Sequence, residues 1–111
     1  ISAYTRHHLL KTDLRMITTL TLEFSMKTGK QPEFLNLLND ALVATRAFDG
    51  CIKVDTFAET DGTSVFLLEQ WETRKQQETY SQWRLDNGLM ELIEPYLSGP
   101  PVRKYYEAID G

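Results

Sequence analysis

The sequence has little cysteine and no long apolar run, and each shortage excludes a class of protein. Cys51 is the single cysteine among 111 residues, so the chain cannot form an internal disulfide. No stretch approaches the roughly 20 apolar residues of a membrane span, and none resembles the apolar core of a signal peptide. We therefore expect a cytoplasmic protein that does not enter a membrane.

Positive charge and histidine are also scarce. The chain has 12 Lys and Arg against 16 Asp and Glu, a formal net charge of -4. The basic residues do not cluster, so a nucleic-acid partner is not expected. The only histidines are the neighbours His7 and His8. Adjacent side chains seldom reach one ion, so we expect no metal site.

The composition is 41% hydrophobic and 25% charged, as in one ordinary globular domain. Residues 1–16 show no sustained periodicity, whereas a clear pattern begins directly after them. We expect residues 1–16 to be an N-terminal extension, either native or introduced for expression, and residues 17–111 to form the domain.

Residues 65–71 form the most strongly apolar run and predict a central strand of a sheet. Side chains alternate along a strand, so its two faces have different members. One face carries Val65, Leu67, Glu69 and Trp71, and the other carries Phe66, Leu68 and Gln70. Both faces have apolar members, and the chain is too short to cover both with its own helices. We therefore expect a second copy to cover one of them.

The remaining pattern predicts the order βαββαβ. Period-two alternation indicates a strand over residues 16–26. A helix follows Pro32, with an inward stripe of Phe34, Leu37, Leu38, Ala41 and Leu42. A strand over residues 51–59, with Ile52, Val54 and Thr56 on one face, joins the central strand through a hairpin at residues 60–63.

Thr73 and Gln76 match a helix capping box, and the helix that follows carries Tyr80 and Trp83 on one face. A second helical run places Leu89, Leu92, Ile93, Tyr96 and Leu97 on one stripe, shortened by Pro95. A last strand covers residues 102–109. The predicted fold class is α+β, a ferredoxin-like arrangement with an antiparallel four-stranded sheet.

Several of these segments together resemble the antibiotic biosynthesis monooxygenase family, from Ile17 to Ile109. The segments are the first alternating strand, Lys27-x-Gly29-Lys30 before Glu33-Phe34, then Phe48-Asp49-Gly50-Cys51 and Glu69-Gln70-Trp71-Glu72. The resemblance implies a dimeric α/β barrel, a homodimer joined through the sheet face. It also implies oxygenation of phenols or quinols, with no metal and no flavin or other cofactor, in a cavity between sheet and helices.

One departure from the family concerns the catalytic base. Many members have a histidine nine residues after the strand tryptophan, where this sequence has Tyr80. The haem-degrading branch is less similar still, since its ligand histidine and its strand asparagine are both missing. An unperturbed tyrosine pKa near 10 makes Tyr80 a poor base at neutral pH, so a hydrogen-bonding role is favoured.

The candidate catalytic residues are Tyr80 and Glu69, whose carboxylate is able to orient a phenol or accept its proton. The candidate substrate-binding residues are Trp71, Trp83, Arg84 and Phe57, with Arg84 favouring an anionic substrate or enolate. Two structural roles remain open beside these. Trp71 would instead anchor the core, and Glu69 would pair with a base across the sheet. Cys51 is expected to be a buried small hydrophobe.

The leading functional hypothesis is a cofactor-independent monooxygenase for a small aromatic, quinol-type or conjugated carbonyl compound. One alternative is a non-catalytic dimeric protein that binds a small molecule. Another is an isomerase or lyase of a small hydroxy-carbonyl metabolite, which needs acid and base groups but no oxygen.

Overall fold

The computed structural model describes residues 17–110. The predicted extension at residues 1–16, with His7 and His8, lies outside the described residues. No helix in the described part of the chain is long and apolar enough to cross a membrane.

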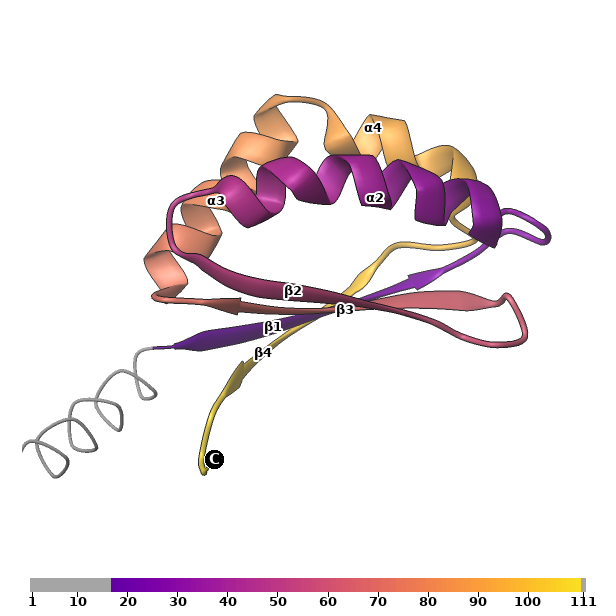
Figure 1. Ribbon diagram of the computed structural model, residues 1–111. Coiled ribbons are helices and arrows are strands. Elements are labelled where there is room, and N and C mark those ends of the chain that lie inside the picture. Colours follow the sequence, from indigo (N-terminus) through magenta and orange to yellow (C-terminus); the bar gives the residue numbers. More distant parts are fainter. Residues whose placement is uncertain (1–16, 111) are drawn as a thin grey trace, which may run out of the picture.

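The structure has two layers, an antiparallel sheet with helices on one face (Figure 1). The strand order is β2-β3-β1-β4, which confirms the predicted ferredoxin-like α+β fold. The strands are β1 (Thr18–Ser25), β2 (Cys51–Ala58), β3 (Ser64–Trp71) and β4 (Val102–Glu107). The helices are α2 (Gln31–Ala47), α3 (Arg74–Asp86), α4 (Leu89–Ile93) and the 3-10 turn η1 (Glu94–Tyr96).

The core lies between the sheet and α2. Pro32 stands in the first turn of α2, where a missing N–H costs nothing. From there the predicted stripe turns Phe34, Leu38 and Leu42 inward, and all three are buried. The Phe34 ring packs 5.2 Å from Phe24 of β1, centroid to centroid. The helical period therefore predicted correctly which side of α2 meets the sheet.

The alternation of β3 also holds. Val65, Leu67, Glu69 and Trp71 are buried beneath the helices, while the residues between them are partly exposed on the opposite face. β3 pairs with β1 along its whole length and with β2 on its other side. β3 is therefore an inner strand, as its apolar sequence predicted.

The predicted facing of β2 is wrong at Ile52. The pairing of β2 with β3 shifts register between Cys51 and Lys53, which marks a β-bulge. A bulge inserts one residue and reverses the alternation beyond it. Ile52 is consequently 45% exposed, whereas Cys51 packs against the core and Val54 is buried.

The helical stripe after residue 88 is wrong at Leu92, which is 54% exposed. The α-helix there has only five residues, and the 3-10 turn η1, which contains Pro95, follows it directly. Ile93 and Leu97 of the predicted stripe are buried, and Leu89 and Tyr96 pack against the core, so the stripe is wrong at Leu92 alone. Two strands are also shorter than predicted, because β1 ends at Ser25 and β4 ends at Glu107.

The start of α3 is fixed by the predicted capping residues. The Thr73 hydroxyl oxygen accepts a hydrogen bond from the Gln76 backbone N–H at 3.2 Å. Gly50 lies against this turn, with a positive φ of 91°, and its carbonyl accepts from Glu72 N at 2.8 Å. A Cβ at position 50 would come within 2.5 Å of the Gln76 side chain.

We expect Gly50→Ala to lower the free energy of unfolding more than Gly62→Ala does. Both glycines have positive φ, which costs an alanine roughly 1 kcal/mol. Only position 50 adds a steric conflict, since nothing lies within 4 Å of a Cβ at Gly62. The added conflict is worth about 1–3 kcal/mol. Urea unfolding of the two variants measures the difference, and equal losses would contradict the close contact with α3.

Candidate functional site

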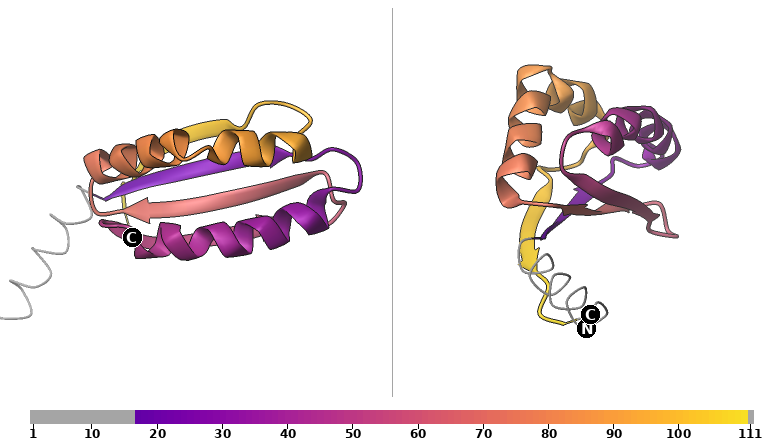
Figure 2. Two further views of the ribbon diagram at one scale, coloured as in Figure 1. Left: turned by 90° about the horizontal axis from the view of Figure 1, so that it is seen from above. Right: turned by 60° about the vertical axis from the view of Figure 1, so that its left-hand side comes forward.

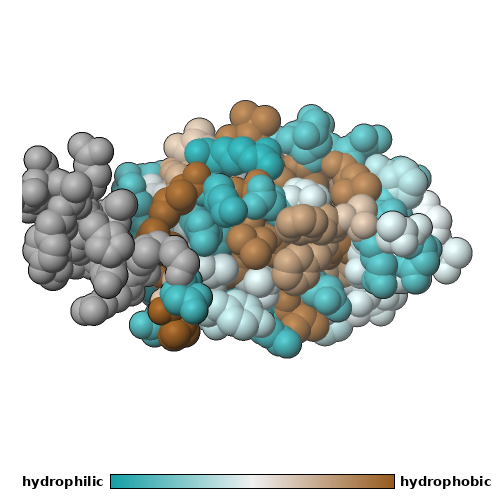
Figure 3. Space-filling view, turned by 60° about the horizontal axis from the view of Figure 1, so that its bottom comes forward, coloured by the Kyte–Doolittle hydropathy of each residue, from teal (hydrophilic) through white to brown (hydrophobic). Residues whose placement is uncertain are grey.

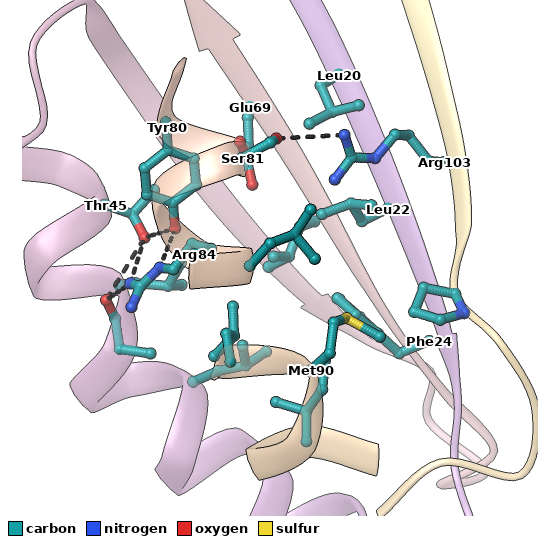
Figure 4. Close-up of a pocket in the computed structure, with 18 of the residues that line it drawn as sticks. Leu20, Leu22, Phe24, Thr45, Glu69, Tyr80, Ser81, Arg84, Met90 and Arg103 are labelled. Atoms are coloured by element: carbon teal, nitrogen blue, oxygen red, sulfur yellow. Dashed lines mark hydrogen bonds between the residues drawn. The ribbon is translucent and has the colours of Figure 1, made fainter. Parts of the chain in front are cut away.

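A cavity of about 330 Å³ lies between the helices and the sheet (Figure 4). On the covered face of the sheet, α2 runs along one edge and α3 with α4 along the opposite edge (Figure 2). The walls are mainly apolar, and they include Leu20, Leu22, Phe24, Leu38, Leu42 and Ile93. The polar lining residues are Thr45, Glu69, Gln77, Tyr80, Ser81, Arg84 and Arg103. A few polar groups in an apolar hollow is the usual composition of a small-molecule site.

A group of three hydrogen-bonded side chains in the cavity, Tyr80, Thr45 and Arg84, joins α2 to α3. The Tyr80 hydroxyl lies 2.5 Å from Thr45 Oγ1 and accepts a hydrogen bond from Arg84 Nε at 2.6 Å. Arg84 Nη2 donates to Thr45 Oγ1 at 3.1 Å and to the Ala41 carbonyl. Figure 4 shows these side chains at one end of the cavity. Thr45, which the sequence analysis missed, follows the buried Leu42 at helical spacing and so belongs to the same inward stripe.

Glu69 is a buried carboxyl in the wall of the cavity. It is only 2% exposed, and its Oε1 accepts a hydrogen bond from Trp71 Nε1 at 2.9 Å. Both side chains lie on the helix side of β3 because they are two residues apart on one strand. No basic residue in the described part of the chain forms an ion pair with Glu69.

Burial sets the protonation of both candidate catalytic residues. It raises the pKa of the Glu69 carboxyl, against the opposing effects of the Trp71 N–H and the charges of Arg103 and Arg84. Burial also raises the pKa of the Tyr80 hydroxyl, although its hydrogen bonds with Thr45 and Arg84 oppose the rise. Tyr80 therefore keeps its proton at neutral pH and is suited to donate a hydrogen bond. Glu69, once ionised, is a stronger base than an exposed glutamate.

The two tryptophans stand behind these polar groups instead of lining the cavity. Trp71 is fully buried and its ring lies 5.0 Å from that of Tyr80. Trp83 packs on Phe48 at 5.5 Å, and the Arg84 guanidinium lies 4.8 Å above its ring. Phe48 also contacts Tyr80 at 5.2 Å. These aromatic rings fix the positions of Tyr80 and Arg84.

Phe57 lies apart from the other predicted site residues. It pairs with Phe66 on the opposite face of the sheet and is 54% exposed. The structure thus brings together Glu69, Tyr80 and Arg84 in the cavity, places Trp71 and Trp83 next to them, and separates Phe57 from all five.

A second polar group lies at the other end of the cavity and was missed by the sequence analysis. Arg103 Nη1 donates to Ser81 Oγ at 3.2 Å and to the Tyr105 hydroxyl at 3.3 Å. The fully buried Gln77 donates to Ser81 Oγ at 2.7 Å and accepts from Tyr105 at 2.6 Å. The alternation of β4, which puts Arg103 and Tyr105 on one face, was the available signal.

Among residues 17–110, no group of three or more His, Cys, Asp or Glu is arranged to hold a metal ion. Cys51 is partly buried beside the core, and burial raises the pKa of its thiol, with the nearby Glu69 charge adding to the rise. A raised pKa leaves little reactive thiolate, so Cys51 is not a candidate nucleophile.

These features define a class: a ferredoxin-like α+β protein with an apolar cavity between its sheet and helices and a carboxyl, a phenol and a guanidinium in the cavity wall. Residues 17–84, more than half of the chain, match the model of the antibiotic biosynthesis monooxygenase family. The chain belongs to this family. No curated protein matches it closely enough to count as a relative.

Solved structures share the fold at low sequence identity. The monooxygenase from the gene ActVA-Orf6 of Streptomyces coelicolor, in complex with nanaomycin D, is 22% identical with a TM-score of 0.75, covering 90% of this chain and 94% of that one. Rv0793 from Mycobacterium tuberculosis is 19% identical with a TM-score of 0.76, covering 86% and 97%. A conserved protein from Methanosarcina mazei Go1 is 17% identical with a TM-score of 0.77, covering 87% and 97%.

The burial of Glu69 predicts a pH-dependent stability that Glu69→Gln removes. The pKa of Glu69 is higher in the folded protein than in the unfolded chain. The protonated carboxyl therefore contributes its full stability below the pKa of the unfolded chain, and this contribution is lost as pH rises through the pKa of the folded protein. Glutamine keeps the oxygen that accepts from Trp71 but cannot ionise. We therefore expect the variant to gain stability relative to wild type as pH rises from about 4 to 8.

Urea unfolding across this pH range measures the effect, and Glu72→Gln, which changes an exposed carboxyl on the same segment, is the control. Wild type and Glu69→Gln curves that stay parallel across the range would contradict the desolvation of Glu69.

Proposed function

We propose that this chain is a cofactor-independent monooxygenase for a small aromatic, quinol-type or conjugated carbonyl compound. The observation that carries the proposal is the buried Glu69 carboxyl, which shares an apolar cavity with the Tyr80 hydroxyl and the Arg84 guanidinium. These three groups supply a base, a hydrogen-bond donor and a fixed positive charge. A reaction through a substrate anion needs all three.

Glu69 is the base in this mechanism. Its ionised form accepts a proton from a substrate carbon or hydroxyl activated by the conjugated ring. Burial raises the pKa of this carboxyl, so its affinity for the proton is closer to that of a weakly acidic substrate. The Trp71 N–H holds the carboxyl in place.

Tyr80 and Arg84 stabilise the anion that results. Negative charge moves onto the substrate oxygen as the proton leaves. In the proposed mechanism Thr45 donates its O–H to the Tyr80 oxygen, so that the Tyr80 O–H donates to the substrate oxygen. The Arg84 guanidinium, which donates to the Tyr80 oxygen at 2.6 Å, polarises the phenol and strengthens this donation. Preorganised donors in an apolar cavity are most effective at this kind of stabilisation.

The anion then reacts with molecular oxygen. For a ring CH₂ group, the carbanion gives two electrons to O₂ and a C–O bond forms, leaving a hydroperoxide once a proton is added. Loss of the second C–H proton and cleavage of the O–O bond release water and leave a carbonyl. One oxygen atom enters the product and the other becomes water, and the substrate supplies all four electrons.

The family supports this proposal, as does the solved monooxygenase of the same fold with a bound ligand. The volume of about 330 Å³ is near the lower end of the range of about 300–1,000 Å³ for ligand pockets, which favours small substrates. Tyr80 in place of a histidine shifts the basic role to Glu69.

The helix-free face of the sheet supports a homodimer as part of the same proposal. Phe57 and Phe66 form a pair on this face, their ring centroids 6.1 Å apart, and Val102 and Tyr106 of β4 are each 50% exposed. Figure 3 turns this side toward the viewer and shows brown apolar side chains among teal polar ones. A second copy packed sheet to sheet would remove these apolar groups from water.

We expect oxygen uptake by the metal-free protein with at least one compound in a panel of anthrones, naphthols and quinols. Glu69→Gln should lower the rate by a factor of about 100 or more, since it removes the base. Tyr80→Phe should lower it by roughly 100-fold, since it removes one donor to the anion. An oxygen electrode measures the rates. Glu72→Gln and Tyr96→Phe, the same changes outside the cavity, should leave them unchanged.

The pH profile separates the two residues. In wild type kcat/KM should rise with pH through the raised pKa of Glu69, and the rise should be lost in Glu69→Gln but kept in Tyr80→Phe. No uptake by folded protein would overturn the proposal. Thermal stabilisation by a compound that stays intact would then indicate a binding protein, and oxygen-independent conversion an isomerase.

We also expect the protein to elute as a dimer, and Phe57→Glu to convert it to a monomer, because the change would bury one carboxylate from each copy in the interface. Size exclusion with light scattering measures the mass. Val43→Glu is the matched control, since Val43 is 68% exposed on α2. A monomeric wild type, or a dimer that Phe57→Glu leaves intact, would contradict the sheet-to-sheet arrangement.

A further inference from the structure

We propose that Arg103 and Ser81 form a carboxylate-binding subsite in the cavity, so that the preferred substrate is an aromatic or conjugated acid. That a substrate binds here rests on the proposed function, whereas the subsite itself rests on the hydrogen bonds of Arg103 and Ser81. It lies on β4 and α3, at the opposite end of the cavity from the group formed by Tyr80, Thr45 and Arg84 (Figure 4).

Arg103 has unused hydrogen-bond donors. Its Nη1 donates to Ser81 Oγ and to the Tyr105 hydroxyl, at 3.2 and 3.3 Å. A guanidinium has five N–H groups in a planar fork. In residues 17–110, Nε and Nη2 of Arg103 have no acceptor, and no carboxylate forms an ion pair with it. The unused edge matches the two oxygens of a carboxylate.

Ser81 supplies a further donor next to this edge. Its Oγ accepts from Gln77 Nε2 at 2.7 Å and from Arg103 Nη1 at 3.2 Å. Because both bonds use the oxygen as an acceptor, the Ser81 O–H remains to donate, and it has no acceptor in the described part of the chain. In the orientation that Gln77 has here, its Nε2 donates to Ser81 and its Oε1 accepts from Tyr105 at 2.6 Å, which leaves the Ser81 O–H to donate to a ligand.

The charge of the cavity favours an anion. The chain as a whole has a formal net charge of -4. Among the residues that line the cavity, however, Arg84 and Arg103 are basic and only Glu69 is acidic. The cavity thus has positive charge in excess even when Glu69 is ionised. A hollow with apolar walls strengthens the attraction of such charges for an anionic ligand.

The spacing of the polar groups indicates the shape of the ligand. In Figure 4, Leu20 and Leu22 of β1 flank Arg103, and Glu69 lies between Tyr80 and Arg103. A planar ring would lie along the apolar wall of the cavity, with an ionisable oxygen near Tyr80 and a carboxylate at Arg103. A neutral phenol would fill only one of the two polar ends.

The test compares 6-hydroxy-2-naphthoate with 2-naphthol, which differ only in the carboxylate opposite the hydroxyl. At about pH 7.5 the carboxylate is ionised and the naphthol is neutral. We expect the acid to bind wild-type protein roughly tenfold more tightly by calorimetry, a preference that weakens as salt is added. Arg103→Gln should abolish the preference and leave 2-naphthol binding unchanged, which also shows that the cavity is intact.

Two further variants sharpen the test. Ser81→Ala should reduce the preference several-fold without abolishing it, because one donor is lost and the charge is kept. Lys75→Gln is the matched control: it removes the same charge from an exposed position of α3 outside the cavity, and the preference should persist.

Equal affinity for the two compounds in wild type, an unchanged preference in Arg103→Gln, or no binding of either compound would overturn the subsite. Such a result would leave the proposed oxygenation of neutral quinols uncontradicted. Conversely, tight binding of the acid without any oxygen uptake across the panel would keep the subsite and overturn the oxygenation.

Discussion

The hydrogen bonds between α2 and α3 are the interaction on which the cavity depends. Arg84 reaches from α3 to the Ala41 carbonyl and to Thr45 of α2, and the Tyr80 hydroxyl meets Thr45 between them. The two helices lie along opposite edges of the same face of the sheet (Figure 2), so these hydrogen bonds join them beside the cavity that a ligand would occupy. No buried side-chain nitrogen or oxygen in the described residues is left without a hydrogen-bond partner, and these bonds contribute to that.

A tyrosine at the position where many family members have a histidine changes the division of chemical roles. Histidine titrates near neutral pH and is able both to accept and to donate a proton. Tyr80 is buried and hydrogen-bonded to Arg84, and its raised pKa keeps its proton in place, so it does not serve as a base at neutral pH. In the proposed function the proton-accepting role therefore goes to Glu69, whose pKa burial also raises.

Much of the fold was predictable because it depends on regular periodicity. The alternation of β3 and the stripe of α2 each gave the correct buried side, and the element order gave the topology. The facing of Ile52 was wrong because a bulge broke the alternation of β2, and Leu92 is exposed although Ile93 and Leu97 of the same predicted stripe are buried. In the site, Glu69, Tyr80 and Arg84 were predicted from residue type and spacing. Local patterns place Thr45 on the inward stripe of α2 and Arg103 on one face of β4. The hydrogen bonds that give Thr45, Ser81 and Arg103 their roles join distant segments, and no local pattern shows those bonds.

The hydrogen bonds of Thr45 with Tyr80 and Arg84 join residues that are far apart in the sequence, which affects the order of folding. Thr45 and Arg84 are 39 residues apart, whereas β2 and β3 pair through a short hairpin. Closing a long loop costs more conformational entropy than closing a hairpin, and contacts distant in sequence form more slowly. The hairpin is therefore expected to form early and the link between α2 and α3 late. The cavity would be the last part of the domain to form, and a ligand would stabilise the product of that last folding step alone.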